Sequence, residues 1–221
     1  MSFAATHLVG FGAIRDAAAG GKVLAYQTNA ADPANLTTYT FSAQAIGTAA
    51  SDRYVIVGVA GSNTASEPST VTVGGVSATK VVGTAGGNHS AGLWVALVTS
   101  GSTADIVVTW PGSIDRCAIG VWSSTGLSSV TPSNTATSNA TPGSCTVTTL
   151  AGGFAIAFSH LGYGTVTWSG TGVTQDFNTS IEASVKNTGA SAATDGTNLT
   201  FTATYSTTFD ATTRPMVAAS F

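Results

Sequence analysis

Histidine and serine are the first residues of this chain to test for catalytic chemistry. Serine is abundant, but a serine nucleophile needs a neighbouring base, and the sequence holds 3 histidines. These are His7, His89 and His160. None of them accompanies a G-x-S-x-G turn, the motif that exposes a nucleophilic serine between a strand and a helix. We therefore predict no Ser–His catalytic arrangement.

Carboxylates are the second candidates, because a glycosidase needs two of them facing each other about 5–10 Å apart. Glu67 and Glu182 are the glutamates, and Glu67 lies in a polar loop that would hold an acid poorly. Asp105 and Asp115 flank one strand–turn–strand unit, where we expect them to close turns or to pair with Arg116. We predict that the protein is not an enzyme and that it has no catalytic residues.

Oxygen-rich loops could bind a metal ion. Asp176-Phe-Asn-Thr-Ser180 and Asp195-Gly-Thr-Asn198 offer the oxygen ligands that calcium prefers. The same residue types are also ordinary turn formers. No glycine-rich phosphate loop with Lys and Ser/Thr is present. We predict no metal site and no cofactor, with a calcium-binding loop as the alternative.

The composition explains why candidate catalytic and metal-binding residues are scarce. Only 8% of the residues are charged, whereas about 25% is usual for a soluble domain. Ser, Thr, Gly and Ala replace them, and no run of about 18 apolar residues suggests a membrane span. The formal net charge of −3 gives nucleic acid and anionic lipid nothing to attract. An uncharged polar surface is cheap to desolvate, so it suits packing against neighbouring molecules.

Short strands fill the chain from about residue 37 onward. Residues 38–46 alternate with period two, and residues 53–60 form a continuous β-branched run that is typical of a buried strand. Gly74-Gly75 marks a two-residue hairpin between apolar runs. Roughly a dozen such strands at regular spacing predict an all-β fold, a jelly-roll-like antiparallel β-sandwich. Residues 131–143 are the one plausible linker, but short strand-like segments of the same kind continue after them. We therefore predict a single domain over residues 32–221.

Cysteine and tryptophan positions add two smaller expectations. Cys117 and Cys145 are predicted to be buried free thiols, with a disulfide as the alternative. Three of the 4 tryptophans sit inside apolar runs and are expected in the core. Trp168 lies between Gly164 and Gly170 and is the best candidate for an exposed, sugar-contacting indole.

The central part of the chain resembles structural proteins of tailed bacteriophages and related gene-transfer particles. The resemblance spans about residues 38–160 and is carried by six short segments. They are Val71-Thr-Val-Gly-Gly-Val-Ser-Ala-Thr79, Leu93-Trp-Val-Ala-Leu97, Asp105-Ile-Val-Val-Thr109, Cys117-Ala-Ile-Gly-Val-Trp122, Gly126-Leu-Ser-Ser129 and Gly152-Gly-Phe-Ala-Ile156. The resemblance implies a β-sandwich virion component, such as a head decoration, spike or tail accessory protein. It carries over no catalytic residues.

Residues 1–31 differ from the rest and are predicted to form an N-terminal extended arm. Its large apolar side chains lie on a glycine-broken backbone: Phe3, Leu8, Val9, Phe11 and Ile14. Burying each would contribute roughly 1.5–3 kcal/mol, while ordering the backbone costs about 1–2 kcal/mol per residue. The balance favours order only between subunits, so we predict an assembly arm. No basic residue precedes the apolar stretch, which disfavours a signal peptide.

The sequence therefore predicts a non-enzymatic virion structural protein, assembled in the host bacterial cytoplasm. Its expected partners are other virion proteins and further copies of itself, with a host-surface glycan as a candidate and neither nucleic acid nor membrane. The alternative is a carbohydrate-binding adhesin module that mediates attachment to a host surface.

Overall fold

The structure, a computed structural model, describes residues 21–161, 164–181, 185–206 and 214–221. These residues form 17 β-strands and no helix, and every strand pairing is antiparallel. The all-β, antiparallel β-sandwich class predicted from the sequence is thus confirmed. No described helix is long and apolar enough to cross a membrane.

The first sandwich consists of two sheets formed by residues 23–125. The inner sheet has the order β1-β9-β3-β7-β6 and the outer sheet the order β2-β8-β4-β5. The inner strands are β1 (Val23–Asp32), β3 (Tyr54–Ser62), β6 (Thr79–Gly86), β7 (His89–Leu97) and β9 (Arg116–Thr125). The outer strands are β2 (Leu36–Ala45), β4 (Thr70–Val73), β5 (Val76–Ser77) and β8 (Thr103–Ile114).

The second sandwich follows from residue 134 to residue 220 and also has an inner and an outer sheet. The orders are β10-β17-β12-β15-β14 and β11-β16-β13. The inner strands are β10 (Asn134–Ser138), β12 (Ala151–Leu161), β14 (Thr174–Ser180), β15 (Lys186–Asp195) and β17 (Met216–Ser220). The outer strands are β11 (Gly143–Val147), β13 (Val166–Ser169) and β16 (Leu199–Tyr205).

The two sandwiches repeat one topology. In each, the first, last, third and sixth strands lie side by side, and the second, seventh and fourth form the facing sheet. This is the strand order of a jelly roll, which combines two Greek keys. Strand β1 thus corresponds to β10, β3 to β12, β7 to β15 and β9 to β17. The fifth strand differs between the two sandwiches. In the first it is divided into β5 in the outer sheet and β6 in the inner sheet, whereas in the second it is the single strand β14 in the inner sheet.

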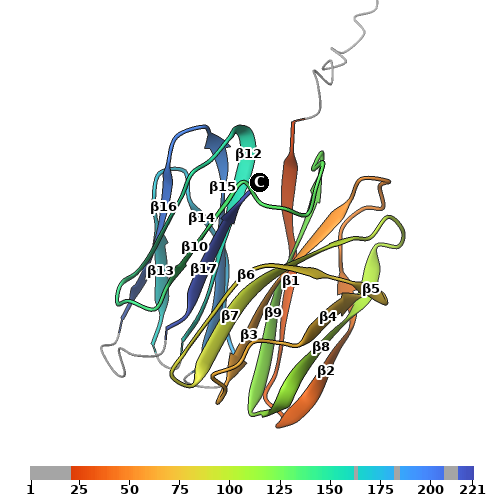
Figure 1. Cartoon of the computed structure of the whole chain (residues 1–221), viewed down its shortest axis with the longest axis vertical. Helices are drawn as coiled ribbons and strands as arrows, with labels where there is room; N and C mark the ends of the chain where they lie inside the picture. Colours follow the sequence, from red (N-terminus) through yellow and green to blue (C-terminus); the bar gives the residue numbers. More distant parts are fainter. Residues whose placement is uncertain (1–20, 162–163, 182–184, 207–213) are drawn as a thin grey trace, which may run out of the picture.

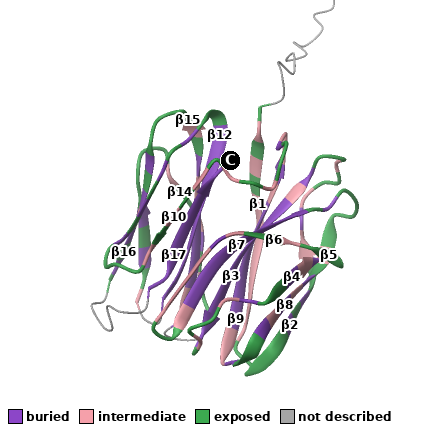
Figure 2. Ribbon diagram, viewed as in Figure 1, coloured by how far each residue is buried: buried purple, intermediate pink, exposed green. Residues whose placement is uncertain are grey.

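The inner sheets pack against each other, so the molecule has four layers of sheet (Figure 1). One apolar core lies inside each sandwich, and a third lies between them (Figure 2). Strand β3 shows how one sequence serves two cores. Val55, Val57 and Val59 face the outer sheet, while Ile56 and Ala60 face the second sandwich. A strand buried on both faces reads as a continuous apolar run, as the sequence of residues 53–60 does.

The contact between the sandwiches, which we call the junction, is two-fold symmetric in part: some of its strand contacts have a counterpart, whereas β7·β12 and β6·β17 have none of similar extent. Strand β3 contacts its counterpart β12, as expected for elements near a two-fold axis. The contact between β9 and β15 is matched by one between β7 and β17, and β1·β14 is matched by β6·β10. An isologous interface of a homodimer has this reciprocal pattern. The chain is thus built like a dimer of jelly rolls joined into one polypeptide.

Two boundaries differ from those expected from the sequence. Residues 32–221 were predicted to form a single sandwich, but the sheets divide into two sandwiches, connected near residues 126–133. The predicted arm covers residues 1–31, of which residues 23–31 belong to β1 and pair with β9 in the first inner sheet. The physical reason is that β1 completes the inner sheet of the first jelly roll. Residues 1–20 lie outside the described part of the chain.

Candidate functional site

Trp168, the sugar-contacting candidate, is a core residue. Its side chain lies on β13 and is 8% exposed. The indole N–H donates to Thr188 Oγ1 at 2.8 Å, and the ring meets Phe201 edge-on with centroids 6.3 Å apart. The exposure predicted for Trp168 is therefore wrong, because β13 pairs with β16 and places the indole inside the second sandwich. The assembly-arm residues Phe3, Leu8, Val9, Phe11 and Ile14 lie outside the described residues.

The described carboxylates serve local structure. Glu67 pairs with Lys80, Asp105 accepts a hydrogen bond from the Ala43 backbone N–H at 2.8 Å, and Asp115 accepts one from Asn35 Nδ2 at 3.0 Å. Glu182 lies outside the described residues.

The two segments considered for calcium have ordinary hydrogen bonds, and the first of them, residues 176–180, belongs to strand β14 and is not a loop. Asp195 accepts hydrogen bonds from the backbone N–H and the hydroxyl of Thr197, which lower the pKa of its carboxyl. Asp176 accepts one from Trp122 Nε1 at 2.8 Å and another from Ser191 Oγ at 3.0 Å. Among the described residues, no group of three or more His, Cys, Asp or Glu side chains could hold a metal ion.

Both cysteines are free and buried, as predicted. Cys117 belongs to the core of the first sandwich and Cys145 to that of the second. Burial raises the pKa of the Cys145 thiol to about 12 and raises that of Cys117 strongly as well. Neither thiol is therefore present as the reactive thiolate at neutral pH.

A Ser–His pair that no sequence motif indicated does occur in the structure. Ser62 ends β3 and His160 lies near the end of β12, and Ser62 Oγ is 2.8 Å from His160 Nε2 across the junction. The two residues are 98 positions apart in the sequence. Only the packing of one sandwich on the other brings them together, so no local motif could have revealed the pair.

The environment of this pair does not suit nucleophilic catalysis. Ser62 is 1% exposed and His160 is completely buried, so a substrate has no access to the hydroxyl. Burial, together with nearby His89 and Arg116, lowers the pKa of His160 well below its usual value of 6.5. A general base works best with a pKa near the working pH. The pair is therefore a buried polar contact that connects the two sandwiches.

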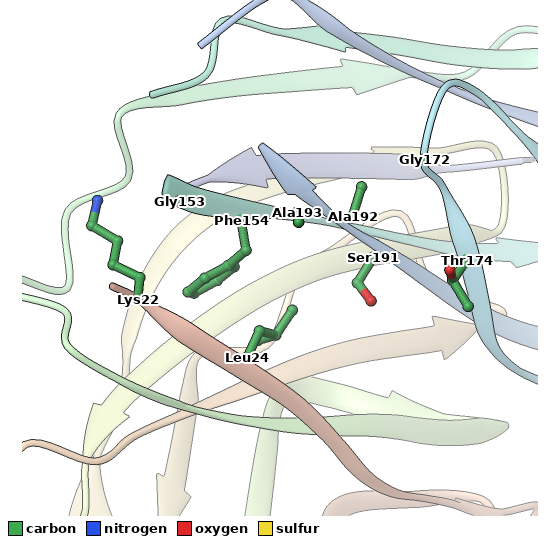
Figure 3. Close-up of a pocket in the computed structure, with 9 residues that line it drawn as sticks. All are labelled: Lys22, Leu24, Gly153, Phe154, Gly172, Thr174, Ser191, Ala192 and Ala193. Atoms are coloured by element: carbon green, nitrogen blue, oxygen red, sulfur yellow. The ribbon is translucent and has the colours of Figure 1, made fainter. Parts of the chain in front are cut away.

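The opposite end of the junction opens into a cleft of about 340 Å³ (Figure 3). Its floor is apolar, with Leu24 of β1 next to Phe154 of β12, and Lys22 stands at its rim. Thr174 and Ser191 of the second sandwich add hydroxyl groups to the lining. Among the described residues, those that line the cleft include no carboxylate and no imidazole. Its described lining thus combines an apolar floor with two hydroxyl groups and one amine at the rim.

No family model, no curated protein and no solved structure matches this chain.

Proposed function

We propose that this chain is a non-enzymatic structural component of a tailed-phage or phage-like particle. In this role it decorates the head or forms part of the spike or tail, and it assembles with itself and with neighbouring virion proteins. The observation that carries the proposal is the pair of jelly rolls whose outer sheets are nearly free of charge. The resemblance of residues 38–160 to virion structural proteins favours the same reading.

The outer sheet of the second sandwich shows this most clearly. Its strands β11, β13 and β16 contain no charged residue. Hydroxyl side chains face solvent instead, with Thr146 and Thr200 hydrogen-bonded to each other at 2.8 Å. On the first sandwich, Asp105 is the one charged residue among the outer strands β2, β4, β5 and β8. A neighbour can cover such faces without desolvating charge, which would cost far more than desolvating hydroxyls.

The size of the outer face indicates how it would be used. With strands about 4.8 Å apart and a rise of about 3.3 Å per residue, the three-stranded sheet presents roughly 14 Å by 17 Å, or about 240 Å². A stable binary complex usually buries about 800 Å² per partner. The face alone is therefore too small to hold a dimer together. It suits a particle in which each subunit makes several weak contacts and a terminal arm adds another.

Quantitative mass spectrometry of purified particles tests the proposal directly. We expect the chain at a fixed ratio to the major head or tail proteins after density-gradient purification and a high-salt wash. Antibody labelling in electron micrographs then places it on the head or the tail. Absence of the chain from washed particles, or a ratio that varies between preparations, would contradict the proposal. The carbohydrate-binding adhesin alternative loses the support of Trp168, whose indole is buried.

A further inference from the structure

Two facing rows of polar residues form one end of the junction. In the first inner sheet, Ser62 is paired with His89 on β7 and with Arg116 on β9. In the second inner sheet, His160 is paired with Asn187 on β15. The rings of His89 and His160 meet edge-on with centroids 4.8 Å apart, and the Ser62–His160 contact joins the rows. The rest of the junction is mainly apolar.

The charged groups around His160 come from several strands. His89 on β7 and Arg116 on β9 both disfavour a second positive charge there, whereas the backbone of Lys186 on β15 acts in the opposite direction. The Lys186 ammonium is turned to Ser180. On the side of β17, Arg214 lies over the ring of Tyr205 at 4.7 Å. Strand β3 contributes the neutral Ser62. Asp115, which precedes β9, accepts a hydrogen bond from the Asn35 side chain.

We propose that this contact is an acid-sensitive latch: uptake of a proton by His160 loosens this end of the junction while each sandwich keeps its fold. The imidazolium would be enclosed between two sheets that already place His89 and Arg116 beside it. Among the described residues, Ser62 of β3, His89 of β7 and Arg116 of β9 cover it from the first sandwich, so movement of the end of β12 away from them would admit water. The apolar contacts around Phe154 and Phe221, toward the other end of β12, need not break. This inference does not depend on the proposed function.

The direction of the pH dependence follows from the neutral state of His160. Its pKa in the closed junction is lower than the 6.5 of an exposed histidine. An opened junction therefore binds more protons than a closed one at mildly acidic pH. The latch is at full strength above pH 6.5 and weakens as the pH falls. The equilibrium constant for opening rises about tenfold for each pH unit below about 6.5, until the closed form also takes up the proton.

Amide hydrogen exchange of the full chain at pH 7 and pH 5, corrected for intrinsic rates, tests the latch. We expect exchange in residues 59–62 and 158–161 to rise at least tenfold at pH 5, while the outer strands β8 and β16 keep their protection. His160→Gln retains a hydrogen-bonding side chain but cannot take up a proton, so it should abolish the rise. His7→Gln removes a different histidine, serves as the matched control and should behave as the wild type.

Three results would overturn the proposal. The first is an equal rise in His160→Gln and wild type. The second is a simultaneous loss of protection in β8 and β16, which would mean acid unfolding of whole sandwiches. The third needs no variant: nuclear magnetic resonance titration of the wild-type imidazoles would show His160 with a pKa of 6.5 or higher. This measurement decides the question even if His160→Gln does not fold.

Discussion

Phe158 of the second sandwich occupies the space that the missing side chain of Gly58 leaves on the first. A Cβ built on Gly58 would lie 2.5 Å from Cδ2 of Phe158, too close for any real contact. Gly58 is on β3 and Phe158 on β12, the two strands that meet near the two-fold axis of the junction. Phe177 of the second sandwich fills the same kind of space at Gly120 on β9, and Trp122 of the first sandwich does so at Gly189 on β15. Glycine–aromatic pairs thus set how closely the inner sheets approach.

Gly58→Ala should separate the sheets locally and lower the free energy of unfolding by about 1–3 kcal/mol, the usual cost of overpacking a filled core. Urea unfolding followed by tryptophan fluorescence measures this change. Gly112→Ala is the matched control, because nothing lies within 4 Å of a Cβ at that position. Combining Gly58→Ala with Phe158→Leu should cost less than the sum of the two single changes. Equal stability of the two alanine variants would show that the glycine contact is unimportant.

Arg53 holds together a loop region of the first sandwich. Its side chain is 1% exposed and donates to the carbonyl oxygens of Gly47, Val98, Ser100 and Gly101 at 2.6–2.8 Å. Arg53→Met should lower the free energy of unfolding by at least about 3 kcal/mol, because several buried carbonyls lose their donor.

Arg53→Lys should recover only a small part of that loss, since a single ammonium cannot reach all four carbonyls with the geometry of a guanidinium. Thermal unfolding of both variants by circular dichroism provides the comparison. Full recovery by lysine would mean that only the positive charge matters.

Asp176 is a partly buried carboxylate whose pKa is raised, mainly by desolvation, although Trp122 and Ser191 donate hydrogen bonds to it. Because the pKa of this carboxyl is higher in the folded chain than in the unfolded chain, its ionisation lowers the free energy of unfolding. The charge of Asp176 therefore destabilises the fold at neutral pH. Asp176→Asn keeps an acceptor oxygen for the Trp122 N–H and removes the charge. We expect this variant to unfold at higher urea concentration than the wild type at pH 7.

The difference should shrink as the pH falls through the range in which Asp176 becomes protonated, and it should vanish near pH 3. Asp195→Asn is the opposite control. Hydrogen bonds from Thr197 lower the pKa of that carboxyl, so the variant should be the less stable one at pH 7. A pH-independent difference for Asp176→Asn would contradict the role given to its charge.

Deletion of residues 1–16 tests the assembly arm. The shortened chain retains all the described strands, from β1 at Val23 onward, so it should keep its circular dichroism spectrum and unfold as the full chain does. Its self-association, measured by sedimentation velocity, and its incorporation into particles should fail. A milder variant, Phe3→Ser with Phe11→Ser, should weaken both without changing chain length. Normal incorporation of the shortened chain would refute the arm hypothesis.

Individual strands were largely predictable, and their higher-order arrangement was not. The β-branched run at residues 53–60 lies almost wholly within β3, and Gly74-Gly75 joins β4 to β5. The duplication was hidden because corresponding strands share a pattern of buried positions rather than identical residues: Tyr54–Ser62 reads YVIVGVAGS, whereas Ala151–Leu161 reads AGGFAIAFSHL. Glycines near Trp168 suggested a loop, but the strand pairing that buries its indole involves residues far along the chain.

The junction between the jelly rolls has a consequence for the polarity of the molecule. A true homodimer with this arrangement would present the same sheet at both ends and could not distinguish one end from the other. Joining the halves in one chain allows the two outer sheets to differ, and they do: one carries Asp105 in a four-stranded sheet, and the other has three strands without charge. A molecule whose inner packing is partly symmetric thus has two chemically distinct ends.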